Sequence, residues 1–404
     1  MSHRGVPRRL LGALASWLVL VTVVRVVVAL PEHCPAVSRD VLVDSAQEAV
    51  AWLERNQLDD GQWIYRYDAE NNEIIDDYNT VRHAGVVMSL YQAATLDLDG
   101  ALEVADAGTA YALDNLVRHD DWAAFEPRSN RVTTGAAALL VAGLVERRLL
   151  TDDDRYDEVM RELSRFLLAH VEPSGAVIES WDRRAEEPRY GLYSPFFTGE
   201  VYWALALMHL AFPGEGWDEP ALRIGHYIAT ERDEAEGWWP ELPDHWAAYG
   251  MWVVTMWPDR PDPSRPLPDV QVPYVERQAG LGSIQTRYES QRVDHWPRYL
   301  LRGRRTLGAG LGTVSEQLTG LWQVSVADER LGHLSDPIAE RALCVAGMVV
   351  DRQVTAAEAE EYGSPELARG AWFQFGFTQM DDQQHALSAL LLTLPIIDAQ
   401  ESHS

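Results

Sequence analysis

The chain has 404 residues, of which 47% are hydrophobic and 24% are charged, so it can bury a sizeable core as a globular protein. Its formal net charge is −28, and all 34 basic residues are arginines. The lack of lysine excludes Schiff-base chemistry by a lysine side chain. The acidic surface argues against a nucleic-acid partner, because it would repel phosphate.

Residues 1–35 have the pattern of a targeting segment. An arginine-containing start precedes an apolar run from Leu10 to Val24, which Arg25 interrupts and which then continues to Leu30. This pattern is typical of a signal peptide or an uncleaved signal anchor, and the lack of a small-residue cleavage site near Leu30 favours the anchor. Because the positive flank stays in the cytoplasm, we expect the folded part to be membrane-tethered outside it, in the periplasm or the extracellular space.

The chain contains two cysteines, Cys34 and Cys344. Two cysteines cannot form a zinc cluster by themselves. In an oxidising compartment they can form a disulfide, and otherwise they are two free thiols. The sequence leaves both alternatives open.

Residues 36–400 are predicted to form one all-helical domain in which two kinds of helix alternate. The first kind is amphipathic with a charged face, and it is predicted near 44–57, 101–118, 153–170, 218–232, 268–280 and 336–353. The second kind is apolar almost all round, and it is predicted near 81–96, 134–148, 198–211, 245–257, 312–325 and 382–397. A helix that is apolar on all sides is buried on all sides, so the second kind forms an inner layer.

Six alternations of an outer and an inner helix predict an (α/α)6 toroid of six helical hairpins. An open α-solenoid is the alternative, because the spacing of the inner helices is irregular. Glycine turns followed by large residues precede several inner helices, at Gly61, Gly175, Gly237 and Gly370. Such turns predict short extended segments at the rim of a ring, which favours closure.

One of these turns carries a family resemblance. The spacing Gln57-x-x-x-Gly61-x-Trp63 resembles the QW repeat of terpenoid cyclase and protein prenyltransferase toroids, which implies a structural staple between a helix end and its neighbour. The chemistry of those families does not carry over, since the Asp-x-Asp-Asp acid motif is missing and Cys344 lies among apolar residues. The overall plan also resembles six-hairpin glycosidases and toroidal polysaccharide lyases.

In such a toroid the inner helices all begin on one face, so polar residues at their starts would share one cavity lined by positive helix dipole ends. The first start has the richest set, with Asp77, Asn79, Arg82 and His83. Asn79 or the following threonine can cap the helix. Arg82 is poorly placed in a first turn unless it meets a carboxylate or a ligand, and a structural pair with Asp76 or Asp77 is the alternative.

The last start is the second candidate cluster, with Asp381, Asp382, Gln384 and His385. Asp381 can simply cap the helix, while Asp382 and His385 share a helix face. Because the first and last inner helices are neighbours in a closed ring, we expect His83 and Asp382 to approach each other.

The intermediate starts add further polar residues, and aromatic residues lie near the same face. Glu200 and Glu316 interrupt apolar helices, where a carboxylate is costly unless it is paired with an arginine or kept for function. The remaining candidates for substrate binding are Glu241, His245, Tyr65, Trp63 and Trp372. Aromatic faces of this kind can stack on sugar rings, although ordinary core packing explains many of them.

These residues lead to the hypothesis of a carbohydrate-active enzyme that cleaves a glycosidic bond of a polysaccharide. Two carboxylates would act as acid and as base or nucleophile, chosen from Asp382, Glu200 and Asp77. Asn79, Arg82 and His83 would position the substrate. With a uronic polymer, elimination would replace hydrolysis, and His83 or Tyr65 would then move the proton.

Two other classes of function remain open. A terpenoid cyclase-like enzyme would have an apolar, aromatic-lined cavity with an acid at its top. A non-catalytic envelope binding or assembly toroid would have all its inner carboxylates matched by arginines. No metal motif and no phosphate-binding glycine loop stands out in the sequence, so neither a metal nor another cofactor is expected.

Overall fold

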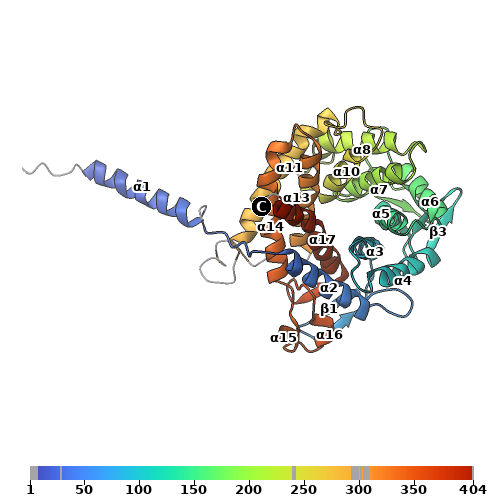
Figure 1. The fold of residues 1–404 in the computed structure, drawn as a ribbon, viewed down its shortest axis with the longest axis horizontal. Coiled ribbons are helices and arrows are strands. Elements are labelled where there is room, and N and C mark those ends of the chain that lie inside the picture. The colour runs from blue at the N-terminus through green and yellow to red at the C-terminus, as the bar shows by residue number, and fades with distance from the viewer. Residues whose placement is uncertain are drawn as a thin grey trace, which may run out of the picture.

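The structure is a computed structural model that describes residues 8–27, 30–238, 243–292, 300, 303 and 309–402. These residues form the predicted (α/α)6 toroid (Figure 1). The inner helices are α3 (Thr80–Ala94), α5 (Thr134–Thr151), α7 (Phe197–Ala211), α10 (His245–Thr255), α13 (Ala309–Ala327) and α17 (Met380–Ser402). The outer helices are α2 (Arg39–Arg55), α4 (Ala101–Asp114), α6 (Asp157–Leu168), α8 (Asp218–Thr230), α11 (Val272–Ser290) and α14 (Ser335–Asp351).

The inner helices close into a ring. Each packs against the next in chain order, and α17 packs back against α3, so the ring has no open end and the solenoid alternative is wrong. The outer helices lie around it, with α4, α6 and α8 against α3, α5 and α7 and with α2 and α14 against α17 (Figure 1).

The residue pattern explains the two layers. Along α6, Met160, Leu163, Phe166 and Leu167 are buried at helical spacing while the charged residues face outward, as an outer helix requires. In α5, all residues from Thr134 to Val145 are buried, and Gly143 lies against the backbone of Met88 in α3. Small residues in the inner layer therefore let neighbouring helices approach closely.

Short strands and short helices connect the long helices. The strands form three small antiparallel sheets with the orders β2-β1-β8, β3-β4 and β5-β6-β7. Their bounds are β1 (Arg66–Asp68), β2 (Glu73–Ile75), β3 (Leu116–His119), β4 (Trp122–Phe125), β5 (Arg131–Thr133), β6 (Ser180–Asp182), β7 (Glu187–Pro188) and β8 (Phe377–Gln379). The short helices are α9 (Arg232–Ala235), η1 (Asp269–Gln271), η2 (Gly332–Leu334), α15 (Ala356–Ala359) and α16 (Pro365–Ala368).

The glycine turn at Gly61 works as the QW resemblance implies. Its φ of 89° lies in the left-handed region, and an added Cβ would collide with the backbone oxygen of Ala107, so glycine is required there. Gln57 donates its side-chain amide to the Val104 carbonyl at 2.9 Å, and the Trp63 indole donates to the Leu53 carbonyl at 3.0 Å. The two side chains staple the end of α2 to the neighbouring helix α4.

The N-terminal helix α1 (Arg8–Val27) projects away from the ring (Figure 1). Its described side chains, from Leu10 to Arg25, are exposed. Across the described residues, no helix combines the length and the apolar character needed to cross a membrane. The predicted membrane span is therefore not confirmed.

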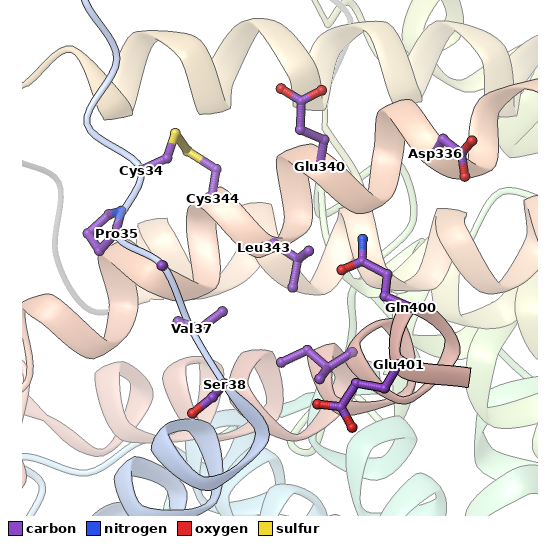
Figure 2. Close-up of a pocket in the computed structure, with 12 residues that line it drawn as sticks. Cys34, Pro35, Val37, Ser38, Asp336, Glu340, Leu343, Cys344, Gln400 and Glu401 are labelled. Atoms are coloured by element: carbon purple, nitrogen blue, oxygen red, sulfur yellow. A yellow bond between two sulfur atoms is a disulfide. The ribbon is translucent and has the colours of Figure 1, made fainter. Parts of the chain in front are cut away.

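A disulfide joins Cys34 to Cys344, so the alternative of two free thiols is wrong (Figure 2). It connects the segment before α2 to the middle of α14, across 310 residues of sequence. The backbone N–H of His33 also donates to the Ser290 carbonyl at 2.8 Å, and Arg341 pairs with Glu32. The chain that enters the ring is thus fixed to its outer layer at several points.

Candidate active site

A cavity of about 680 Å³ lies where the inner helices begin. We call it the central cavity. All six inner helices contribute to its wall, as the toroid arrangement predicts, so residues distant in sequence meet in one basin. The residues that line it are Asn79, Val81, Arg82, Leu139, Ser194, Pro195, Phe196, Phe197, Glu200, Pro243, His245, Trp246, Gln285, Ala309, Gly310, Thr313, Val314, Gln317, Asp381, Gln384 and His385.

His385, in the first turns of α17, is held by a buried hydrogen-bond chain. Its Nδ1 lies 2.6 Å from Oε2 of Glu316, whose other oxygen accepts a hydrogen bond of 3.0 Å from the Tyr249 hydroxyl. Glu316 is completely buried on α13. Burial alone would lower the pKa of His385, but the charge and hydrogen bond of Glu316, together with Asp381 and Asp382, raise it to about 9. His385 is therefore protonated at neutral pH.

His245, the first residue of α10, stands beside His385 with ring centroids 5.2 Å apart. Burial and the positive charge of His385 lower the pKa of His245 well below its ordinary value. The two neighbouring rings therefore differ in charge at neutral pH, with His245 neutral and His385 cationic. In such a pair, the neutral histidine can act as a general base and the protonated one as a general acid.

Local sequence fixes the position of His245. Asp244 caps α10 by accepting the backbone N–H of Ala247 at 2.9 Å, and the buried guanidinium of Arg232 pairs with the same carboxylate. Because α10 begins directly after this cap, His245 lies in the first turn of the helix, at the wall of the cavity. The indole of Trp246 lies next to it, with the two ring centroids 4.3 Å apart.

Four buried polar atoms without a hydrogen-bond partner in the described parts of the chain belong to residues that line the central cavity. They are Oε2 of Glu200, Nε2 of His245, Oε1 of Gln285 and Oε1 of Gln317. Each such atom costs free energy when it is left unpaired. A polar ligand in the central cavity could supply hydrogen bonds to these side chains.

Glu200 lies on α7 at the cavity wall. Burial raises its pKa to about 8, with Asp244 and Asp381 acting in the same direction and His385 against it. The side chain is therefore protonated at neutral pH and can donate a hydrogen bond or a proton. No arginine pairs with Glu200 or Glu316 among the residues that the structure describes, so the arginine-matched alternative from the sequence is wrong for these two carboxylates.

Arg82 and Asp381 join the two ends of the ring. Nε of Arg82 lies 3.5 Å from Oδ1 of Asp381, and the same oxygen lies 3.7 Å from Nε2 of His385. Arg82 also contacts the Tyr65 hydroxyl and donates to Gln379 at 3.3 Å. The carboxylate that Arg82 was expected to meet is thus Asp381, and neither Asp76 nor Asp77.

Asp382 has a different place from the one expected. Its Oδ1 accepts the backbone N–H of Ala309 at 3.0 Å, and its Oδ2 accepts that of Gln379 at 3.2 Å. Burial raises its pKa to about 7, although these backbone hydrogen bonds act in the opposite direction. Asp382 ties the starts of α13 and α17 together and does not line the central cavity.

His83 is enclosed in the core. Its Nδ1 lies 2.6 Å from the Tyr78 hydroxyl, and its Nε2 lies 2.8 Å from the Gly108 carbonyl, so both ring nitrogens have partners. The rings of Trp63, Tyr111 and Phe125 surround it, and burial lowers its pKa to about 4. The structure therefore does not bring His83 to the lining of the central cavity, and its ring nitrogens contact Tyr78 and Gly108 and not Asp382.

The other predicted site residues divide between the cavity and the rest of the fold. Asn79 lines the cavity and caps α3 by accepting the Arg82 N–H at 3.1 Å, and Gln384 lines it beside His385. Asp77 is exposed and does not line the cavity, and Trp63 and Trp372 are core residues. Tyr65 is buried outside the lining, and its hydroxyl contacts Arg82. Glu241 lies outside the described residues.

Sequence reasoning missed two glutamines at the cavity wall, Gln285 and Gln317. Gln317 is buried on α13 one residue after Glu316 and donates to Gln278 at 2.6 Å. Its position inside an apolar helix is the same signal that singled out Glu316. Gln285 lies on α11, which was predicted to end at residue 280, so no sequence signal placed it near the cavity.

The ligand atoms of His245, Glu316 and His385 lie within 4.8 Å of one another, which is close enough to hold a metal ion. Both Glu316 oxygens already accept hydrogen bonds, from Tyr249 and from His385. A metal ion would have to displace these hydrogen bonds. We therefore interpret the three residues as a hydrogen-bonded proton-transfer unit.

No protein-family model matches the chain, and no curated protein matches it either. Among solved structures, it is similar to a cellobiose 2-epimerase from Spirochaeta thermophila DSM 6192, with a TM-score of 0.59 and 14% identity over 87% of this chain and 93% of the other. An unsaturated glucuronyl hydrolase specific for heparin gives a TM-score of 0.58 and 12% identity over 90% and 99% of the two chains. A D-mannose isomerase gives a TM-score of 0.57 and 11% identity over 89% and 98%. At these identities, the likeness establishes the toroid fold that these carbohydrate-active proteins share with this chain.

Proposed function

We propose that the protein is a carbohydrate-processing enzyme that moves a proton at the carbon next to the carbonyl group of an open-chain sugar, as an isomerase or an epimerase. One observation carries the proposal. A neutral histidine with an unpaired nitrogen, His245, stands beside a protonated histidine, His385, in the wall of a cavity. The fold shared with an epimerase and a sugar isomerase supports the substrate class.

In this reaction, His245 Nε2 accepts the proton from the carbon next to the carbonyl, and His385 Nε2–H donates its proton to the carbonyl oxygen. The product of this step is a neutral enediol. His245 then gives its proton back to carbon while His385 takes a proton from one of the two hydroxyls of the enediol. Protonation of the former carbonyl carbon, with loss of the proton from the other hydroxyl, gives the isomer. Protonation of the original carbon after its opposite face has turned toward His245, with loss of the proton that His385 had donated, gives the epimer. Substrate and product have the same composition, so no oxidant or reductant is needed.

The surrounding residues suit this chemistry. Glu316 is a positioning residue, because it fixes the His385 ring through Nδ1 and keeps the imidazolium charged. Asp381 lies 3.7 Å from the opposite nitrogen of His385 and pairs with Arg82, and both side chains line the cavity and offer polar contacts to sugar hydroxyls. Trp246 presents an aromatic wall against which a sugar can pack.

The test is incubation of the purified protein with a panel of reducing sugars, including glucose, mannose, fructose and cellobiose. The products are identified by NMR. Appearance of a ketose or of an epimer at the carbon next to the carbonyl supports the proposal. No change in any sugar of the panel, with a folded protein, counts against it.

Glycosidic cleavage is the second candidate, because the protonated side chain of Glu200 and the carboxylate of Asp381 line the same cavity. Of the carboxylates first expected to react, Asp382 has both oxygens engaged and Asp77 is outside the cavity, so Glu200 and Asp381 would have to be acid and base. Release of a monosaccharide from aryl glycosides or mannan oligosaccharides, abolished in Glu200→Gln, would favour cleavage. Elimination through His83 has no support from its place in the core.

We also propose that the folded domain lies outside the cytoplasm and is held there by its N-terminal segment. The basic and apolar pattern of residues 1–35 and the disulfide between Cys34 and Cys344 support export, since structural disulfides persist in oxidising compartments. An alkaline phosphatase fusion after residue 402 should be active in cells. Its inactivity, with the fusion protein intact, would contradict export, and release of the fusion by salt or carbonate washing would contradict the membrane tether.

A further inference from the structure

A second cavity opens beside the central one. It has a volume of about 410 Å³ and shares three lining residues with the central cavity, namely Asn79, Val81 and Phe197. We call it the side cavity. Its other lining residues are Tyr78, Thr80, Tyr111, Glu126, Pro127, Arg128, Ser129, Arg131 and Thr133. The proposed reaction uses none of these nine residues.

The two arginines of the side cavity are in different states. Arg131 is paired with Glu179, with Nη2 of the arginine 2.7 Å from Oε2 of the glutamate. Arg128 is exposed, and its guanidinium has no acidic partner in the described parts of the chain. In a protein with 62 acidic and 34 basic residues, a cation without a counterion at a cavity wall is available to a ligand.

The acidic residue of the side cavity is already engaged. Oε1 of Glu126 accepts the backbone N–H groups of Arg128 and Ser129 at 3.1 and 2.8 Å, and Oε2 accepts the Thr80 hydroxyl at 3.4 Å. The carboxylate thus shapes the loop that carries Arg128. Glu126 is thus engaged with the loop, and no ion pair to the guanidinium of Arg128 occurs among the residues that the structure describes.

We propose that the side cavity binds a second sugar unit that carries an anionic group, and that Arg128 recognises this group. The proposal rests on the proposed function, because the reducing unit would occupy the central cavity with its open-chain carbonyl at the histidine pair. The next unit would then lie past Asn79 and Phe197, against the rings of Tyr78 and Tyr111. A carboxylate or a sulfate on that unit has the chemistry that a planar guanidinium binds in two-pronged fashion.

The size of the side cavity agrees with one additional ring. Its volume falls within the range typical of small-molecule sites, and the aromatic rings supply the apolar face that a pyranose needs. The preferred substrate class is therefore an acidic disaccharide or a longer acidic oligosaccharide with a free reducing end.

The test measures binding without turnover. In the His245→Gln background, calorimetry compares cellobiose with cellobiouronic acid, a glucuronyl-β-1,4-glucose that differs in its second ring by a carboxylate, and with the 6-sulfate of cellobiose on the same ring. The acidic sugars are expected to bind about tenfold more tightly, and Arg128→Gln is expected to remove that preference. Arg128→Lys should keep part of it, and high salt should weaken it.

Arg223→Gln, on the outer helix α8, is the matched control and should leave the ratio of the two affinities unchanged. A ratio that is the same with and without Arg128, or binding of neither class of disaccharide, would overturn the subsite. A preference for only one of the two acidic sugars, lost in Arg128→Gln, identifies the group that is recognised. Loss of the preference in Arg128→Gln without isomerisation of any sugar would retain the subsite and overturn the proposed reaction.

Discussion

The start of α3 and the facing starts of α10 and α17 look alike in sequence, since each combines a histidine with nearby acidic or polar residues. In the structure they differ in how far their polar atoms are satisfied. At α3, both nitrogens of His83 have protein partners, Tyr78 and Gly108, inside an aromatic cage. At α10, Nε2 of His245 has no hydrogen-bond partner among the described residues, lies 4.0 Å from Oε2 of Glu316, and belongs to a residue that lines the central cavity.

This difference separates structural polar clusters from reactive ones. A histidine whose hydrogen bonds are complete stabilises the fold and stays neutral. A histidine that keeps a free nitrogen beside a charged partner can exchange a proton with a ligand. Polar composition at a helix start is the same in both cases, so the distinction depends on tertiary packing.

The largest loss of activity is expected for a substitution of His245. His245→Gln removes the base while keeping a polar side chain of similar size, so we expect the turnover of any sugar substrate to fall about a thousandfold. Melting temperature should change little. The exposed His226 of α8 offers a control, since His226→Gln should retain full turnover. Equal turnover in wild type and His245→Gln would remove this histidine from the reaction.

The role of Glu316 can be tested through the pH dependence of activity. In the wild type, activity needs protonated His385 and should fall as the pH rises through about 9. Glu316→Gln removes the charge that raises this pKa, so the fall should move toward the ordinary histidine value near 6.5, and activity at pH 8 should drop about 30-fold. Activity should recover toward pH 6, which a purely structural defect would not produce. An unchanged alkaline limb in a pH–rate profile would refute this role.

His83 should show the opposite behaviour, with a large effect on stability. His83→Ala removes the hydrogen bonds to the Tyr78 hydroxyl and the Gly108 carbonyl and leaves a cavity among aromatic rings, and we expect the free energy of unfolding to fall by about 3 kcal/mol. Urea denaturation measures this loss. The turnover of the remaining folded protein should stay close to that of wild type. Loss of turnover at unchanged stability would reverse the assignment of the two regions.

The same histidine gives a pH dependence of stability. Its pKa is lowered to about 4 in the folded state, so the unfolded state binds the proton first as the pH falls. The contribution of neutral His83 is fully present above about pH 6.5 and is lost between there and pH 4. In His83→Phe this part of the acid-side decline should be smaller, as measured by urea denaturation at several pH values. An identical decline in both proteins would contradict the burial argument.

The smallest expected effect is at the staple outside both regions. Gln57→Ala loses the hydrogen bond to the Val104 carbonyl and should lower the free energy of unfolding by about 1 kcal/mol. Turnover should be unaffected, because the staple touches neither histidine of the central cavity. A loss of activity as large as that in His245→Gln would show that the two parts of the fold are not independent.

Much of the fold could be predicted because helix periodicity and the contrast between the two kinds of helix are local signals. The start of α10 was predicted at His245, where it begins. The fifth outer helix was predicted to end at residue 280, but α11 continues through Gly280 and Gly282 to Ser290. Gly282 lies against the side chain of Leu318 in α13. Tertiary packing there overrides the weak helix propensity of glycine.

The site was predictable only in part, for the same reason. The toroid places every inner helix start on one face, which correctly brought Glu200, His245 and His385 to one cavity. The choice between His83 and His385 depends on which side chains fill the space around each ring, and a single sequence does not contain that information. Asp382 likewise became a helix tie because the α13 backbone offers it an N–H group from 73 residues away.

Proton transfer by the histidine pair would exchange the hydrogen at the carbon next to the sugar carbonyl with solvent. Glucose, mannose and cellobiose are incubated in D2O with wild type and with His245→Gln, and deuterium at that carbon is followed by NMR. We expect incorporation with the wild type in at least one sugar and none above background with His245→Gln. Exchange that is equal in the two proteins, or cleavage of a glycoside with no exchange in any sugar, would contradict proton transfer by the histidine pair.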